Sequence, residues 1–477
     1  SDAELEEHIP GQVKKFMYDH HINFYTIDGV KLGIETGMGP TRINTILQSA
    51  FFTITKIIPE EHAVQLMKDA AQKTYGRKGQ DVVEKNWAAI DAGAKNWHKV
   101  EIPESWANAA DEGLDFKKVT SDRKDVEAFV NNIQIAVSAQ EGNGLKVSDV
   151  LPYVDGSGAS AFEKRGIAVN VPVWNAESCI ECTFCSYVCP HAAIRPIAMT
   201  EEEAANAPAG TVTKDLTGMP GYKFAIVVSS LDCTGCGSCA NVCPGNMKAA
   251  TLTMTRLDEA QALPNQQTAF DYAVKLPIKN DVVEKFKETT VKGSQFKQPL
   301  LEFSGACAGC GETPYIKLIT QLFGDRMYVA NATGCSSIWG NSSPSTPYTV
   351  NAKGHGPAWS NSLFEDAAEF GYGMFLANDA IRSQLKAKVE AWGGEGSQEY
   401  LDTFTKGAEN GTATEKLIAA LEADGSDAAK DILKEKDYLA KKSQWIFGGD
   451  GWAYDIGFGG VDHVLASGKD INVMVFD

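Results

Sequence analysis

Eight of the eleven cysteines belong to two copies of one spacing pattern, C-x2-C-x2-C-x3-C-P. The first copy contains Cys179, Cys182, Cys185 and Cys189, and the second contains Cys233, Cys236, Cys239 and Cys243. In this pattern three cysteines wrap the corners of a [4Fe–4S] cubane, and the fourth ligates the cluster of the other copy. The spacing predicts one cluster on Cys179, Cys182, Cys185 and Cys243 and another on Cys233, Cys236, Cys239 and Cys189. Electrons would therefore move one at a time. Zinc sites also use C-x2-C pairs, but two pairs rather than a triplet plus one.

The three remaining cysteines are the pair Cys307 and Cys310 and the single Cys335. Together they could supply three ligands at cluster spacing, and no further cysteine remains for a fourth corner. Either another ligand completes this site or the fourth cysteine lies beyond Asp477. A C-x2-C pair alone also suits a redox dithiol or half of a zinc site.

A Gly449-Asp450-Gly451 turn follows the apolar stretch 445–447 near the end of the chain. Strand followed by Gly-Asp-Gly resembles the opening of the thiamine diphosphate motif, in which the aspartate holds Mg²⁺ and the glycines let the backbone approach the phosphates. By that resemblance further metal ligands are due about 27 residues later, at Asp477. A lone Gly-Asp-Gly is also a common turn.

Length, charge and cysteine usage restrict the class of protein. The 477 residues suffice for about three domains, and the net charge of -18 argues against a nucleic-acid partner. No apolar run approaches the length of a membrane helix, and the acidic start does not read as a secretory signal. Cysteines clustered in this way, and odd in number, favour metal binding in a reducing cytoplasm over a disulfide framework. The acidity suits a basic docking partner or simply solubility.

Residues 1–115 read as the end of an α/β domain, with a linker to about 140. Alternating residues predict a strand over 22–27 and, after an Asp28-Gly29 turn, a second over 30–34. Helices are expected over 43–52, 59–79 and 80–94. The glycine turn at 37–41 between the second strand and the first helix reads either as a phosphate cradle or as an ordinary tight turn.

Residues 140–265 hold both cysteine runs, with an acidic insert at 200–209 and a strand at 222–228 between them. Residues 285–477 form another α/β region, with strand signals at 327–330 and 445–447. The intervening stretch 376–443, rich in Ala, Lys, Glu and Leu, predicts a helical insert.

The later motifs form a specific series, CAGCGETPY at 307–315, ATGCSSIWG at 332–340 and FGGDGWAYDIG at 447–457. With the two cysteine runs, this series closely resembles pyruvate:ferredoxin (flavodoxin) oxidoreductase of anaerobic bacteria, in its middle and C-terminal-side portion. The resemblance implies a multidomain α/β protein. Its parts would be an α/β N-terminal part on the coenzyme A side, an inserted ferredoxin-like α+β domain with two clusters, and a thiamine diphosphate-binding α/β domain that is incomplete at its C-terminus.

The same resemblance implies roles for individual residues. Cys307, Cys310 and Cys335 would hold a third [4Fe–4S] cluster, whose fourth cysteine lies in a missing tail, and Glu312 and Cys335 would border the thiamine diphosphate. The diphosphate and its Mg²⁺ would be lined by Gly449, Asp450, Gly451 and Trp452. Asn44 and Asn86 would contact coenzyme A, although an asparagine at a helix start usually acts as a cap. No catalytic side chain is assigned.

The implied activity is oxidative decarboxylation of pyruvate with coenzyme A to acetyl-CoA and CO₂. Electrons would pass through three clusters to ferredoxin or flavodoxin. The resemblance further implies a homodimer and missing N- and C-terminal parts, so the isolated chain is expected to be inactive. The alternatives are an oxidoreductase for 2-oxoglutarate or indolepyruvate, a non-enzymatic electron-transfer subunit, and a zinc-stabilised interaction module.

Overall fold

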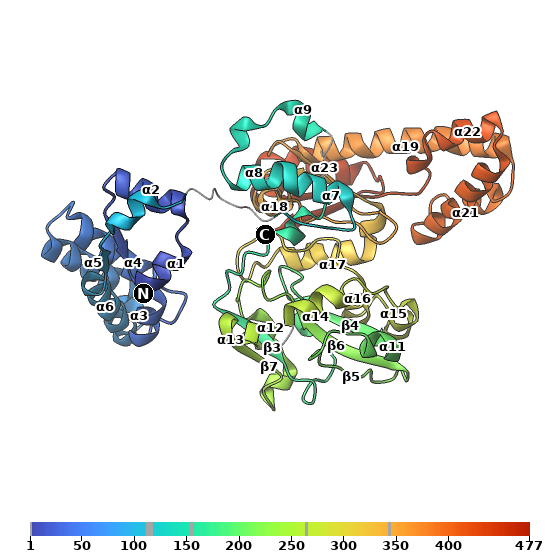
Figure 1. Ribbon diagram of the computed structural model, residues 1–477. Helices are drawn as coiled ribbons and strands as arrows, with labels where there is room; N and C mark the ends of the chain where they lie inside the picture. Colours follow the sequence, from blue (N-terminus) through green and yellow to red (C-terminus); the bar gives the residue numbers. More distant parts are fainter. Residues whose placement is uncertain (1, 111–117, 152–156, 263–265, 342–344) are drawn as a thin grey trace. The chain divides into compact units, whose positions relative to one another are not determined.

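The computed structural model describes residues 2–110, 118–151, 157–262, 266–341 and 345–477, which fall into two compact units, 1–117 and 118–477. The first unit contains mostly helices (Figure 1). They are α1 (Asp2–His8), α2 (Gly11–Asp19), α3 (Gly29–Glu35), α4 (Asn44–Thr55), α5 (Glu60–Tyr75) and α6 (Gln80–Lys95). Strands β1 (Phe24–Thr26) and β2 (His98–Val100) form an antiparallel ribbon. Its core lies where α3, α4 and α6 meet, around Leu32, Ile46 and Ala89.

The strand expected over 30–34 is wrong, because these residues belong to α3. The Asp28 side chain accepts a hydrogen bond from the Lys31 backbone N–H at 2.9 Å and so caps a helix rather than forming a turn. Of the two interpretations of residues 37–41, the ordinary tight turn agrees with the structure. The N–H groups of Met38 and Gly39 both bond the Gly33 carbonyl, each at 2.9 Å, so this turn closes α3 and these two donors are already used.

The second unit begins with a short helical region, α7 (Lys124–Phe129), a π-helical turn (Val130–Gln134), α8 (Ile135–Ser138) and α9 (Val147–Val150). The module that carries both cysteine runs follows. Its first half is β3 (Asn170–Trp174), α10 (Phe184–Tyr187) and β4 (Ile194–Thr200), and its second half is β6 (Tyr222–Val228), α12 (Ser238–Asn241) and β7 (Leu252–Arg256). β3 pairs with β7 and β4 with β6, all antiparallel, so each half completes the sheets of the other. The strand expected at 222–228 is confirmed as β6.

Between the two halves lie α11 (Glu201–Ala205) and the edge strand β5 (Lys214–Asp215). Four helices lead out of the module, α13 (Leu257–Ala262), α14 (Gln266–Ala273), α15 (Asn280–Phe286) and α16 (Val291–Gln295). α14 packs on β6 through Phe270 and Ala273.

A four-stranded parallel sheet in the order β11-β10-β8-β9 forms the last part of the unit. Its strands are β8 (Met327–Ala332), β9 (Ala358–Ser362), β10 (Ser443–Gly449) and β11 (Asn472–Phe476). α17 (Thr313–Phe323) and α18 (Cys335–Gly340) contribute to the core on one face, whereas α19 (Ala367–Trp392) and α23 (Phe458–Ala466) contribute to the core on the other. Strands were expected at 327–330 and 445–447, and both lie in this sheet.

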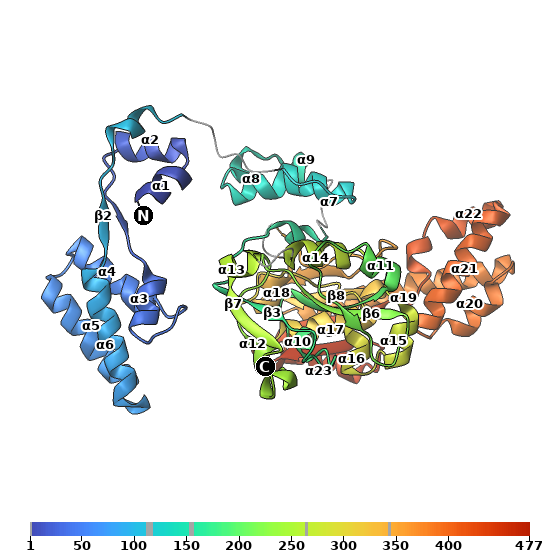
Figure 2. The same cartoon turned by 60° about the horizontal axis from the view of Figure 1, so that its bottom comes forward.

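The stretch between β9 and β10 is helical. α20 (Ser397–Thr403), α21 (Ala408–Asp424) and α22 (Asp427–Leu433) pack beside the later part of α19 around a separate core that includes Leu385, Tyr400 and Leu417 (Figure 2). Among the helices that the structure describes, none combines the length and the apolar content that a membrane crossing demands.

Two glycines of α19 test how tightly this helix packs on the sheet. A Cβ at Gly371 would lie 2.5 Å from the Ile446 side chain, whereas a Cβ at Gly373 would meet nothing within 4 Å. We expect Gly371→Ala to destabilise the unit by about 1–3 kcal/mol through overpacking. Gly373→Ala should instead stabilise it by up to about 1 kcal/mol, because Ala is the better helix former. Thermal unfolding followed by circular dichroism measures both variants, and equal effects would contradict this packing.

Candidate metal and cofactor sites

The two cysteine runs fold into the same loop. In the first run the residues between the cysteines at Glu181 and Thr183 have positive φ, 57° and 62°, and in the second run Gly235 and Gly237 occupy the same two positions with φ of 70° and 78°. In each loop a backbone N–H points at the first sulfur, from Glu181 to Cys179 and from Gly235 to Cys233, both at 3.4 Å. These turns curl the chain so that three thiols face inward. Hydrogen bonds of this kind are among the features that set cluster potentials.

The electrostatic neighbours of the thiols match the exchanged ligand sets. Burial raises the pKa of the Cys182 thiol, and Cys243 and Cys179 contribute further. Burial raises the pKa of Cys233 to about 12, with Cys189 and Cys236 beside it. The fourth cysteine of each run therefore lies with the first three of the other run. Thiols that ionise so reluctantly become thiolates when a bound cation stabilises the charge.

The second set lines a small cavity. Its four cysteines, Cys189, Cys233, Cys236 and Cys239, all lie on the cavity wall. Thr234 Oγ1, also on the wall, is buried and has no hydrogen-bond partner among the described residues. The site thus offers four thiols, apolar walls and a spare hydroxyl, which suits an inorganic cluster that carries sulfide.

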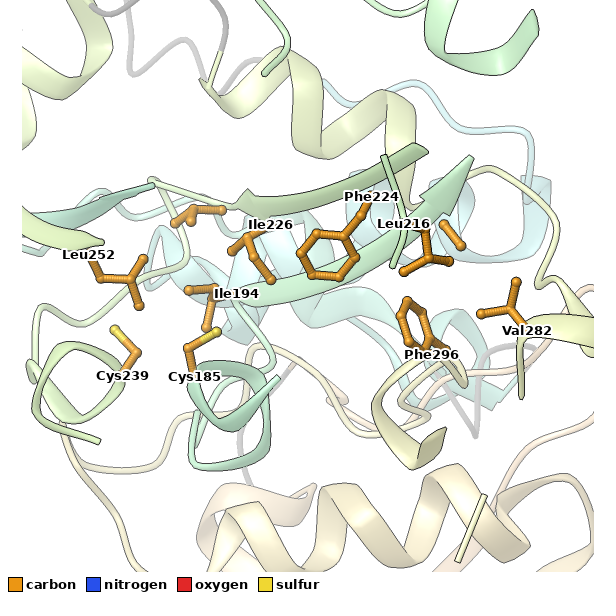
Figure 3. Packing of buried hydrophobic residues seen from close by; sticks show 11 residues of the cluster. Cys185, Ile194, Leu216, Phe224, Ile226, Cys239, Leu252, Val282 and Phe296 are labelled. Atoms are coloured by element: carbon orange, nitrogen blue, oxygen red, sulfur yellow. The ribbon is translucent and has the colours of Figure 1, made fainter. Parts of the chain in front are cut away.

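The two sets meet at Cys185 and Cys239. Both thiols are buried in one hydrophobic cluster with Ile194 and Leu252, and Figure 3 shows them side by side next to these residues. Cys239 is the strongest thiol neighbour of Cys185 and contributes to the raised pKa of Cys185, for which burial is the main cause. Among the described residues, no three His, Cys, Asp or Glu side chains converge closely enough to hold a single metal ion. In a cubane each thiolate binds a different iron atom, so its ligands stand further apart.

The third cysteine group has the same local turn and adjoins the second set. Gly309, between Cys307 and Cys310, has φ of 76° and so matches Gly235. A Cβ placed on Gly309 would lie 3.7 Å from the Cβ of Cys236, which puts the two loops in direct contact. Cys335 begins α18, and its raised pKa is caused first by Glu312, then by burial and by Cys310 and Cys307. The three cysteines and Glu312 therefore gather at one place.

The parallel sheet brings the expected diphosphate residues to one edge. Gly449 of β10 pairs with Phe476 of β11, so Asp450 and Asp477, each one residue further on, follow neighbouring strands at their carboxyl ends. Cys335 follows the next strand, β8. Ligands of open parallel sheets bind at this edge. Two aspartates side by side offer the hard oxygen ligands that Mg²⁺ prefers.

Glu312 is held by a tryptophan from the neighbouring helix. The indole Nε1–H of Trp339, on α18, donates to Glu312 Oε2 at 2.9 Å. This bond fixes the carboxylate at the start of α17, next to Cys335.

Comparison with known proteins finds relatives that align with the whole length of this chain. Residues 178–247 match the family model of a 4Fe-4S dicluster domain, residues 2–96 match that of pyruvate ferredoxin/flavodoxin oxidoreductase, and residues 115–168 match EKR, a domain of unknown function. The chain is 48% identical to pyruvate:ferredoxin oxidoreductase of Moorella thermoacetica and 47% identical to pyruvate-flavodoxin oxidoreductase of Enterobacter agglomerans. Each alignment covers 100% of this chain and 41% of the relative. The chain is homologous to a portion of the pyruvate:ferredoxin/flavodoxin oxidoreductases.

Trp452 is the most deeply buried of the four expected diphosphate residues. Its indole is fully buried in the core behind the sheet edge. It packs directly on Gly448 and Gly457, since a Cβ added to either glycine would lie 2.4 Å from an indole atom. Only its backbone is left to face a diphosphate, and that contact stays a prediction. Gly449 is more open, since its nearest neighbour to an added Cβ is the Phe476 carbonyl oxygen at 3.7 Å.

The two expected coenzyme A residues lie apart within the first unit. Asn44 is exposed at the start of α4, where no side-chain cap forms. Asn86 is buried in α6, and its amide donates to the Val82 carbonyl at 2.8 Å. α4 and α6 run antiparallel, as the bond from Ser49 Oγ to the Ile90 carbonyl and the contact of Gly93 with Ile46 show. Asn86 therefore lies near residue 53, about 14 Å along the helix from Asn44.

Three residues near the clusters carry no signal in the sequence. Glu181 is 1% exposed and holds the first loop to Thr217, through hydroxyl and backbone bonds of 2.9 and 3.1 Å. His191 donates from Nδ1 to the Ser304 carbonyl at 3.1 Å, just before the third cysteine group. Lys317 is buried behind α10. Their spacing gives no motif, because each acts through contacts with residues distant in the chain.

The exchange of the fourth cysteine can be tested by two double variants that share one substitution. If the exchange is correct, Cys179→Ala with Cys243→Ala removes two ligands of one cluster and should cost about four iron atoms per chain. Cys179→Ala with Cys189→Ala damages both clusters and should cost about eight. Iron and acid-labile sulfide analysis of the anaerobically purified holoprotein measures this difference. The reverse pattern would show that each run holds its own cluster.

Proposed function

We propose that this chain is the electron-transferring and thiamine-binding part of an enzyme that oxidatively decarboxylates pyruvate with coenzyme A, with ferredoxin or flavodoxin as electron acceptor. The observation that carries the proposal is the serial arrangement of the cysteine groups. The third group touches the second set at Gly309 and Cys236, and Cys239 of the second set lies in the same buried cluster as Cys185 of the first. The third group also adjoins the sheet edge with Asp450. If the C-terminal region only docked a partner, the three cysteine groups and the sheet edge would not have to be contiguous.

The residues that would hold each group follow from this arrangement. The two exchanged cysteine sets hold two [4Fe–4S] clusters, and Cys307, Cys310 and Cys335 hold three corners of a third. Asp450 holds Mg²⁺, and we propose Asp477 as a second ligand of the same ion. Gly449 and Gly451 leave room for the diphosphate beside the backbone. When bound, thiamine diphosphate supplies the electron sink for loss of CO₂ from a 2-oxoacid, and the clusters supply one-electron carriers.

Glu312 is a fixed negative charge at this site. Its bond from Trp339 sets its direction, and its charge is the largest cause of the raised pKa of Cys335. We therefore place Glu312 beside the thiamine, where a positioned carboxylate can accept a hydrogen bond from the cofactor. Coenzyme A contacts at Asn44 and Asn86 remain a weaker proposal, since Asn86 already donates to its own helix.

The names of the relatives support pyruvate as substrate and ferredoxin or flavodoxin as acceptor. The chain spans about 41% of their length, so the remaining parts of the enzyme would complete the substrate site. We further propose that the enzyme is a homodimer and works in a reducing cytoplasm. Anaerobic reduction of a viologen dye by the complete enzyme, with coenzyme A, tests this. Reduction with pyruvate but not with 2-oxoglutarate is expected, and the reverse would assign a different 2-oxoacid.

Asp450 and Asp455 offer a matched test of the metal site, since Asp455 is exposed on the same turn. Loss of a group that only supports a metal ligand commonly weakens metal binding by about 10- to 100-fold. Asp450 is proposed as a direct ligand, so Asp450→Asn should lower pyruvate-dependent dye reduction by about 100-fold or more. Bound thiamine diphosphate should fall, and iron content should stay at the parent value. Asp455→Asn should leave all three unchanged. Full activity in Asp450→Asn would remove the thiamine assignment while leaving the clusters intact.

A further inference from the structure

A buried lysine crosses from the thiamine-binding region into the cluster module. Lys317 lies on α17, is 1% exposed, and points its ammonium at the carbonyl end of the α10 turn. It donates to the Ser186 carbonyl, to the Tyr187 carbonyl at 3.2 Å and to the Cys189 carbonyl at 3.4 Å. Three acceptors satisfy its three N–H groups. None of them neutralises its charge.

In the part of the chain that the structure describes, none of the groups that act on the charge of Lys317 is a carboxylate. Its charged neighbours in the described structure are Cys189, Cys185 and Arg195, and Arg195 is already paired with Glu302. The adjacent polar side chains are neutral amides, with Gln295 Nε2 donating to Gln321 Oε1 at 3.0 Å. Burial accordingly lowers the pKa of Lys317 to about 8. A buried charge without a counter-ion is costly, and such charges are normally paired.

The two thiols beside Lys317 belong to different clusters. Cys185 is in the first ligand set and lies within α10, and Cys189 is in the second set and follows α10 by two residues. A [4Fe–4S] cluster with four thiolates is an anion, and reduction adds one more negative charge. In this low-dielectric interior a fixed positive charge favours the reduced state.

We propose that the clusters themselves are the counter-ions of Lys317, and that its charge raises the reduction potentials of both clusters in the module. Lys317 is thus a positioning residue that links the thiamine-binding region to the electron carriers. The inference rests on the proposed cluster ligands but not on the substrate. Iron analysis and the cluster signals of the parent protein test those ligands independently.

Three substitutions separate charge from hydrogen bonding. Lys317→Gln keeps N–H donors for the carbonyls and removes the charge, Lys317→Met removes both, and Lys317→Arg keeps both. Lys248→Gln is the matched control, because it removes one charge from an exposed position of the same module, where solvent screens it. Each is compared in the anaerobic holoenzyme by a redox titration followed by electron paramagnetic resonance.

At a fixed ambient potential we expect Lys317→Gln and Lys317→Met to lower the ratio of reduced to oxidised cluster about tenfold, which is about 59 mV for a one-electron couple. Lys317→Arg should stay within about twofold of the parent, as should Lys248→Gln. Full clusters with unchanged potentials in Lys317→Gln would overturn the proposal and leave a purely structural role. If both uncharged variants lose their clusters, Lys317→Arg decides. Intact clusters with parental potentials in that variant support a need for charge, and their loss contradicts it.

Discussion

The exchange of one cysteine between the two loops is the constraint on which the module depends. Because Cys189 lies with the second set and Cys243 with the first, neither half can complete a site alone. The same reciprocity governs the strands, since β3 of the first half pairs with β7 of the second and β4 pairs with β6. Ligand sets and sheets therefore form together. The buried contact of Cys185 with Cys239 at the centre keeps the two sites within one hydrophobic cluster.

The third cysteine group extends this arrangement into the parallel sheet. Its loop repeats the left-handed glycine of the other loops and lies against Cys236, while the helix that follows it, α17, carries Lys317 to the back of α10. One short segment, residues 307–317, therefore makes contact with both cluster loops from two directions. At the other end of the same sheet edge, β10 and β11 hold Asp450 and Asp477 in adjacent register. The parallel strands thus fix the positions of Asp450 and Asp477, and the contact between the two cysteine loops fixes the third group against the module.

The two-cluster domain could be predicted from the sequence, whereas the buried surroundings of its cysteines could not. The cysteine loops could be predicted because their spacing depends only on local geometry. Strands β6 and β10 could be predicted because each is a short apolar run. Over 30–34 the alternation of Val30, Leu32 and Ile34 suits a strand, but the Asp28 cap decided for a helix. The burial of Trp452, the pairing of Gly449 with Phe476 and the contacts of Lys317 all join segments distant in the chain. Spacing alone contains no information on such contacts.

Burial of the thiols also explains why metal and fold are coupled here. The pKa of Cys185 is raised well above its ordinary value, chiefly by desolvation, so its thiolate is costly without iron. With four thiolates in place each cluster is an anion in an apolar cavity, and a positive charge nearby then lowers the energy of the assembled state. Lys317 provides that charge from outside the module, on a helix that begins at the third cysteine group. Assembly of the clusters would therefore also fasten the module to the parallel sheet, because the ammonium of Lys317 on α17 contacts the carbonyls that follow the first cysteine loop.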